Sequence, residues 1–260
     1  MDEKPLILVT NDDGMFAPGL RALVESVRTL GRVIVVSPDS PQSGKGHAIT
    51  LREPIRVHKV DPFRDIEAYE CSGTPVDCVK WAKNVLLKEK TIDLCVSGIN
   101  HGANHSINIL YSGTMSAAME AAMEGIHSIG FSYLDFSFEA DFTIPGKFAT
   151  KISKYMLGLE KNPQKPILLN VNIPNINQTE IKGIKVCRQS NARWVEEFQP
   201  GIDPRGMKYY WLSGQLVNND KGENTDSRAL DEGYVSVVPA QFDLTDYGAF
   251  DSLKGLSDAE

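Results

Sequence analysis

Between residues 6 and 172, short runs of apolar residues alternate with segments whose apolar side chains recur at helical spacing. The first three runs are apolar almost throughout, as expected for strands that are covered on both faces. This alternation predicts an α/β fold built on a doubly wound, mostly parallel sheet. Strands are expected at residues 6–10, 32–37, 92–97, 128–132 and 166–172.

The segments between these strands predict four helices. The first covers residues 20–30, where leucine and valine follow helical spacing. The second begins near Pro75, with Thr74 as its N-cap residue. The third covers the helix-forming run TMSAAMEAAMEG and closes on Gly125, and the fourth covers residues 144–158.

Two parts of the chain depart from the alternation. Within residues 47–71, the stretches HAITL and IRVHKV predict two short antiparallel strands. Beyond residue 180, IKVCRQ, KYYWLSGQLV and GYVSVVPAQF predict strands, and no helix is expected before the last dozen residues. These strands either complete the core sheet or form a hairpin arm that reaches toward a partner subunit. We therefore expect an α/β core at residues 1–180 and a β-rich extension at 181–260 that packs on it and mediates oligomerisation.

Composition narrows the possible partners and the compartment. The net charge of -7 argues against nucleic-acid polymers and anionic membranes as general partners. No apolar run approaches the roughly 20 residues that a membrane-spanning helix needs. The opening MDEKP lacks the apolar segment of a secretory signal, so a cytoplasmic protein is expected. The four cysteines lack CxxC spacing and are expected as free thiols: Cys71, Cys78, Cys95 and Cys187.

Three polar, glycine-rich loops follow predicted strands. They read NDDGMFAPG after the first strand, PDSPQSGKGH after the second, and GINHGANHSINILYSGT before the third helix. Ligands of open α/β sheets bind outside the carboxyl ends of the parallel strands, where these loops begin. We therefore expect the three loops to converge on one site.

Asp12 and Asp13 are the strongest candidate metal ligands. Hard cations such as Mg²⁺ or Mn²⁺ prefer carboxylate, amide and hydroxyl oxygens. The other two loops supply such oxygens from Ser43, Asn100 and Asn104. The alternative for a DDG triplet is a polar turn that caps the next helix.

The third loop also suggests a phosphate site. Ser112, Gly113 and Thr114 immediately precede a predicted helix, whose free amide groups and dipole favour an anion. An ordinary N-cap is the alternative. His101 and His105 are four residues apart, but glycine and asparagine around them favour a loop over a zinc-binding helix face. Protonation of a leaving group is the more plausible role for one of them.

Taken together, these stretches resemble a known family. VTNDDG, SGKGHAIT, SGTPVDCVK and SGINHGANHSINILYSGTMSAAMEAA are similar in order and spacing to the motifs of the SurE (survival protein E) family of metal-dependent nucleotidases. In the tail, RQSNARW, KYYWLSG and EGYVSVVP are also similar to that family. The resemblance thus extends along nearly the whole chain.

The resemblance implies a Rossmann-like catalytic core and hydrolysis of nucleoside 5′-monophosphates, with 3′-monophosphates as further substrates. It implies one divalent cation, and a C-terminal hairpin exchanged between subunits of a homodimer or homotetramer. Asp12 and Asp13 would act in catalysis and, with Ser43 and Asn100, would bind the cation. His105 replaces a more apolar residue, which would alter substrate preference. The residues expected at the substrate are Asn11, Ser43, Gly44, Asn100, Asn104, Ser112, Gly113 and Thr114.

Two questions stay open at the level of sequence. The nucleophile is either a water molecule, oriented or deprotonated by an aspartate, or an aspartate itself. The alternative function is a non-catalytic, metal-dependent nucleotide sensor. A response-regulator-like phosphoacceptor also carries paired acids after its first strand, but it would have about half this length and would lack the long third loop.

Overall fold

A nine-stranded sheet runs through the centre of the chain in the computed structural model, which describes residues 4–137 and 139–258. The ends of the predicted core and extension (residues 1–3 and 259–260) and Phe138 lie outside the described part. The strand order is β3-β4-β2-β1-β5-β6-β7-β11-β8, and the strands from β4 to β7 are mutually parallel. Their bounds are β1 Leu6–Thr10, β2 Arg32–Pro38, β3 Val57–Val60, β4 Glu67–Cys71, β5 Leu94–His101, β6 Ser128–Tyr133, β7 Leu168–Ile173, β8 Ile184–Val186 and β11 Val235–Ala240.

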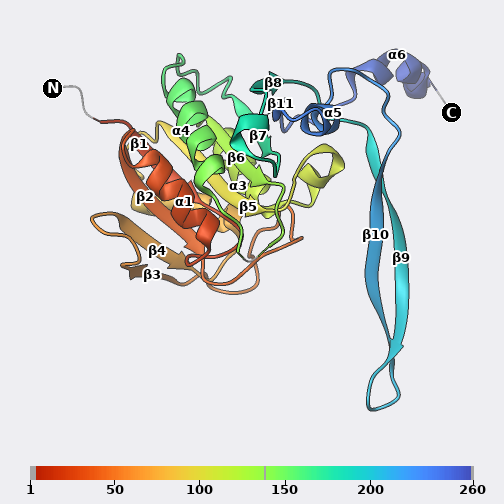
Figure 1. Cartoon of the computed structure of the whole chain (residues 1–260), viewed down its shortest axis with the longest axis horizontal. Helices are drawn as coiled ribbons and strands as arrows, with labels where there is room; N and C mark the ends of the chain where they lie inside the picture. The colour runs from red at the N-terminus through yellow and green to blue at the C-terminus, as the bar shows by residue number, and fades with distance from the viewer. Residues whose placement is uncertain (1–3, 138, 259–260) are drawn as a thin grey trace.

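Helices cover both faces of this sheet, as the doubly wound prediction requires (Figure 1). Helices α1 (Pro18–Val27) and α4 (Thr143–Leu157) pack together on one face. Helices α2 (Pro75–Trp81) and α3 (Gly113–Met123) pack together on the other. The α/β, mostly parallel fold expected from the sequence is therefore confirmed.

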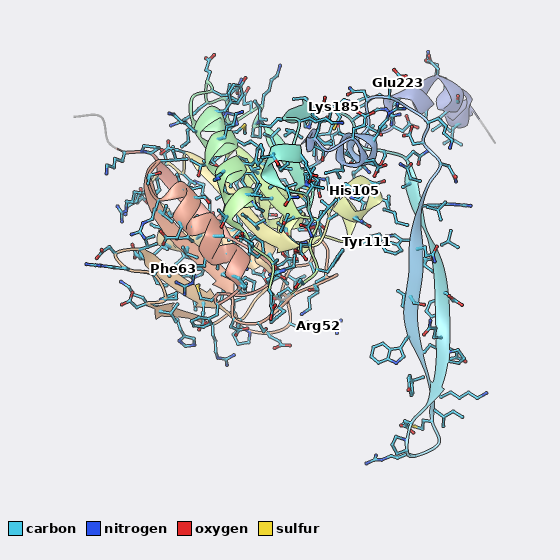
Figure 2. The ribbon with its side chains drawn as sticks, in the orientation of Figure 1. Arg52, Phe63, His105, Tyr111, Lys185 and Glu223 are labelled. Atoms are coloured by element: carbon cyan, nitrogen blue, oxygen red, sulfur yellow. The ribbon has the colours of Figure 1, made fainter. Side chains whose placement is uncertain are left out.

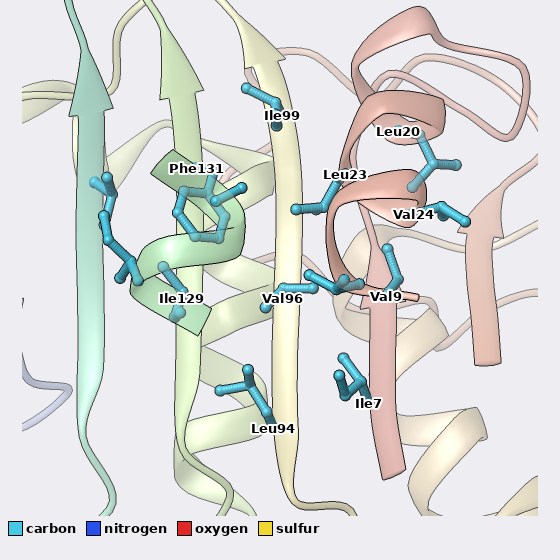
Figure 3. Packing of buried hydrophobic residues seen from close by; sticks show 14 of the residues in the cluster. Ile7, Val9, Leu20, Leu23, Val24, Leu94, Val96, Ile99, Ile129 and Phe131 are labelled. Atoms are coloured by element: carbon cyan, nitrogen blue, oxygen red, sulfur yellow. The ribbon is translucent and has the colours of Figure 1, made fainter. Parts of the chain in front are cut away.

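The pattern of apolar residues explains where the strands and helices of the core pack. Strands β1, β6 and β7 are buried along their whole length, since helices cover both of their faces. Figure 3 shows side chains of the central strands packed with those of α1. The labelled residues of this cluster are Ile7, Val9, Leu20, Leu23, Val24, Leu94, Val96, Ile99, Ile129 and Phe131.

The segment between β2 and α2 differs from the prediction. HAITL is not a strand; instead it forms a loop whose Thr50 amide donates to the Asp77 carboxylate at the start of α2. The partner of β3 is β4, and the two run antiparallel. Strand β4 was not predicted, because its sequence EAYEC does not show the continuous apolar pattern of the inner strands.

Part of the tail completes the core sheet and part of it forms a hairpin, whereas contact of that hairpin with a partner subunit stays a prediction. Strands β8 and β11 extend the main sheet, whereas β9 (Ala192–Ile202) and β10 (Lys208–Asn218) form a separate antiparallel hairpin. This hairpin, here called the arm, reaches away from the core (Figure 1). The expectation of no helix before the last dozen residues is wrong, because α5 (Asp226–Asp231) precedes β11. Helix α6 (Phe250–Leu253) lies near the chain end.

The described residues also show the state of the cysteines and the length of the apolar helices. All four cysteines are buried, free thiols. No helix in the described part is both long and apolar enough to cross a lipid bilayer.

Candidate functional site

The three predicted loops meet at the carboxyl ends of the strands. The amide of Gln42, in the loop after β2, donates to the carbonyl oxygen of Asp12 in the loop after β1, at 2.7 Å. The amide of Gly46 donates to the carbonyl oxygen of Tyr111, which lies just before α3, at 3.2 Å. Backbone contacts therefore place the loops after β1 and β2 against each other and against the start of α3.

Asp12 lies at the centre of this convergence. Its side chain is buried, and the Thr114 hydroxyl donates to its Oδ1 atom at 2.5 Å. Burial, followed by the charge of Asp13, raises the pKa of Asp12 to about 6, against the lowering effect of the Thr114 hydroxyl and amide. The helix N-terminus thus engages a protein carboxylate directly.

The start of α3 is shaped around this carboxylate. A Cβ atom at Gly113 would lie 2.7 Å from the Cβ of Asp12 and 2.9 Å from its Oδ2, so only glycine allows this approach. Ser112 is the N-cap residue, and its hydroxyl accepts from the Met115 amide at 3.1 Å. The predicted SGT helix start therefore contains an ordinary N-cap as well as a contact with Asp12.

Asp13 adds a second partly enclosed carboxylate. Burial raises its pKa, and the His101 amide lowers it. Within the described residues, no lysine, arginine or histidine side chain forms an ion pair with Asp12 or Asp13.

Another buried carboxylate, that of Glu120, has basic side chains beside it that offset its charge. Glu120 on α3 is held by the Lys80 ammonium at 2.5 Å and by Nε2 of His47 at 2.9 Å. Paired carboxylates without such partners fit a bound cation, because burying uncompensated like charges is costly.

The predicted metal set would supply mixed oxygen ligands. A register shift in β5 precedes Asn100. Its side-chain nitrogen, Nδ2, donates to the carbonyl oxygens of His101 and Gly102 at 3.0 and 2.9 Å. Its carboxamide oxygen is then the atom left for a cation. Ser43 lies on an exposed turn directly after Gln42. In the part of the chain that the structure describes, no three histidine, cysteine, aspartate or glutamate residues cluster, so amide and hydroxyl oxygens would have to complete the shell.

Asn11 is used inside the first loop. Its side chain is buried, its Nδ2 donates to the Gly14 carbonyl oxygen at 2.9 Å, and its Oδ1 accepts from the Ser37 hydroxyl at 2.5 Å. These bonds fix the turn that carries Asp12. Gly44 lies on the exposed turn after β2. Contact of Asn11 or Gly44 with substrate stays a prediction.

Asn104 belongs to a buried amide network that the sequence did not reveal. Its amide donates to Oδ1 of Asn172 at 2.7 Å, and its Nδ2 donates to the Ser132 hydroxyl at 2.8 Å. Nδ2 of Asn170 donates to the Asn104 carbonyl oxygen at 2.8 Å. The alternating NVN at the carboxyl end of β7 was the available signal, because it places two asparagines on one face.

The two histidines do not share a helical face. His101 ends β5, and its ring packs edge-on against Phe142 at a centroid distance of 4.9 Å. His105 precedes the 3₁₀ turn Ser106–Leu110, and its Nδ1 atom is buried without a hydrogen-bond partner among the described residues. Burial lowers the pKa of His105, against the charges of Asp226 and Asp231. A neutral imidazole is thus favoured.

Comparisons with known proteins agree with this architecture. The sequence model of the family described as Survival protein SurE matches residues 7–196. A protein named 5′-nucleotidase SurE from Christiangramia forsetii is 56% identical over 246 residues, which cover 94% of this chain and 93% of the relative. One of the same name from Flavobacterium psychrophilum is 53% identical over 96% of both chains. The crystal structure of the SurE protein from Aquifex aeolicus superposes with a TM-score of 0.83 at 43% identity, covering 98% of this chain and 100% of that one. The chain therefore belongs to the SurE family.

Proposed function

We propose that this protein is a divalent-metal-dependent nucleotidase. It hydrolyses nucleoside 5′-monophosphates, and also 3′-monophosphates, to nucleoside and phosphate. The observation that carries this proposal is the pair Asp12 and Asp13, enclosed at the carboxyl edge of the sheet without a cationic side chain among the described residues to offset them. The names of the relatives, 5′-nucleotidase SurE, support the same reaction.

A cation suits the donor set of this site. Asp12, Asp13, Ser43 and Asn100 would hold Mg²⁺ or Mn²⁺, both of which accept mixed carboxylate, amide and hydroxyl oxygens. When bound, the cation supplies positive charge that offsets the two carboxylates and polarises the phosphate ester.

The chain's own residues have distinct tasks in this proposal. Asp12 is held by the hydroxyl and amide of Thr114, whereas Asp13 keeps fewer partners and is assigned to orient and deprotonate the attacking water. Asn104 and the start of α3 stabilise the charge that develops on the phosphoryl oxygens. Asn11 holds the turn between Asp12 and Gly14.

The arm suggests assembly into a homodimer or homotetramer. Its strands expose large apolar side chains, including Phe198, Trp211 and Leu212, which a second copy of the chain would cover. Cytoplasmic localisation is proposed from the sequence alone and is tested by cell fractionation.

The decisive experiment measures phosphate release from a panel of nucleoside 5′- and 3′-monophosphates, with Mg²⁺, with Mn²⁺ and with a chelator. We expect release that requires the cation and falls sharply in D12N and D13N, with the fold retained. Binding of nucleotides by the metal-replete protein without phosphate release would establish the sensor instead. Full activity of both variants would refute the assigned site.

A further inference from the structure

A buried aspartate outside the proposed metal set joins the tail to the substrate loop, defined here as residues 102–111. Asp226, at the start of α5, is fully buried. Its Oδ2 accepts from the Ser106 amide at 2.8 Å, and its Oδ1 accepts from the amides of Ser190 and Ser227 at 2.9 and 2.7 Å. One carboxylate therefore binds segments that lie 120 and 36 residues away in the sequence.

Ser106 is a second connection at the same point. Its backbone has a positive φ of 57°, which a residue other than glycine adopts only when its surroundings hold it there. The Ser106 hydroxyl donates to the Ser190 carbonyl oxygen at 2.8 Å and accepts from the Ala192 amide at 3.2 Å. Because Ala192 is the first residue of β9, the base of the arm is bonded directly to the substrate loop.

The base of the arm is itself cross-linked. The Arg188 guanidinium makes two bonds with the Asp220 carboxylate, at 2.7 and 2.8 Å, which join the segments before β9 and after β10. Nε1 of Trp194 on β9 donates to Oδ1 of Asn108 in the substrate loop at 2.8 Å. The labelled His105 and Tyr111 lie on the side of the core that faces the arm (Figure 2).

The substrate loop is thus held from two sides. Asn170 and Asn172 of the sheet bind the backbone of Asn104, and the tail binds Ser106 two residues later. Ser106 and Asn104 are only two residues apart, so a displacement of Ser106 would be passed along the backbone toward Asn104.

We propose that Asp226 is a positioning residue that sets Asn104 at the phosphate site and couples the base of the arm to that site. This inference rests on the proposed function, in which Asn104 contacts phosphate. When the arm is displaced, for example by docking against a second copy of the chain, the displacement is transmitted to the substrate loop through the hydrogen bonds of Ala192, Ser106 and Asp226.

The test compares D226N with D93N in the full-length protein. The D226N change would turn an amide N–H₂ group toward backbone N–H donors, so at least one of the three bonds would be lost. D93N is the control, since Asp93 also accepts a backbone amide, that of Leu6, but at the amino-terminal edge of the sheet, where it is also paired with Lys161. We expect D226N to lower kcat by a factor on the order of ten to a hundred, as a displaced catalytic geometry does. Hydrogen exchange at the amides of residues 104–110 should become faster in D226N and stay unchanged in D93N.

A second variant, N108A, tests the same coupling in case D226N does not fold. N108A removes only the bond from Trp194, near the surface, so it should keep the melting temperature. We expect it to speed exchange over residues 104–110 and to lower kcat less than D226N does. Wild-type exchange and kcat in N108A and in folded D226N would overturn the inference, and so would faster exchange with unchanged kcat. If the wild-type protein releases no phosphate, the proposed function fails, whereas the exchange measurement still reports whether Asp226 couples the arm to the loop.

Discussion

The Thr114 hydroxyl donates to Oδ1 of Asp12 at 2.5 Å, across 102 residues of sequence. This bond fixes the carboxylate that follows β1 against the start of α3. A hydrogen bond to a charged group contributes about 1.5–3 kcal/mol, which corresponds to roughly ten- to a hundredfold in rate. We predict that T114V lowers kcat by up to that factor, measured by steady-state phosphate release, and that loss of the buried bond also lowers the melting temperature in thermal unfolding by several degrees.

T114S is the matched control for this prediction, because it keeps the hydroxyl and removes only a methyl group. It should retain most of the activity. Equal kcat values in T114V and T114S would show that the bond to Asp12 does not matter for turnover.

Gly113 provides a steric test of the same contact. An added Cβ would lie 2.7 Å from the Asp12 Cβ, so either the carboxylate or the helix start must move. We predict that G113A lowers kcat on the order of a hundredfold, the usual scale for a misplacement of about 1 Å. The control is G255A, where a Cβ would meet open space. Wild-type kinetics in G113A would mean that the site tolerates movement of Asp12.

The site residues that could be predicted from the sequence are those that lie next to a recognisable strand or helix. The Asp12 and Asp13 pair lies one residue beyond an apolar strand, and Thr114 opens a run of strong helix formers, so both could be placed at the carboxyl edge of the sheet. Strands β1, β2 and β5 could be located from their apolar runs. The convergence of the loops that follow them is a consequence of parallel topology.

The missed residues act through contacts that are distant in sequence. Asn170 and Asn172 lie in a run that was interpreted as one apolar strand, and their partner Asn104 is more than 60 residues away. Asp226 opens a six-residue helix in a tail that was expected to lack one, and a short helix carries little periodic signal. The HAITL prediction failed because alternation within five residues could not reveal that Thr50 binds Asp77.

Asn172 should matter for both stability and substrate binding. In N172A the buried amide of Asn104 loses its acceptor, which costs about 1–3 kcal/mol. We predict a lower free energy of unfolding by denaturant, a lower kcat and a higher KM for the nucleotide, since Asn104 is freed from the sheet. N175A, beyond the end of the same strand, removes a bond to the Tyr133 hydroxyl and should leave KM unchanged. An unchanged KM in N172A would separate Asn104 from substrate binding.

His105 should make the protein sensitive to mild acid. Burial lowers its pKa below the ordinary value of 6.5, so as pH falls through 6.5 the unfolded chain takes up a proton before the folded one does. The folded state therefore loses stability between pH 6.5 and the lower, folded-state pKa, and none above that window. We predict that wild-type protein loses more unfolding free energy than H105L between pH 8 and pH 5. Parallel stability curves would show that His105 is not buried in its neutral form.

The arm should determine the size of the assembly. Phe198 and Leu212 are cross-strand partners, 63% and 65% exposed, and such neighbouring apolar side chains are costly to leave in water. Phe198 and Leu212 lie in the separate two-stranded sheet and not in the core sheet. The variant F198S/L212S should therefore keep the fold and the melting transition of the core. We predict that light scattering after size exclusion gives a dimer or tetramer for the wild type and smaller particles for the double variant. The cross-strand pair Glu197 and Ser213, replaced by E197Q/S213A, is a polar control that should keep the wild-type mass. A monomeric wild type, or a double variant of unchanged mass, would remove the arm from the interface and leave its apolar side chains to another role.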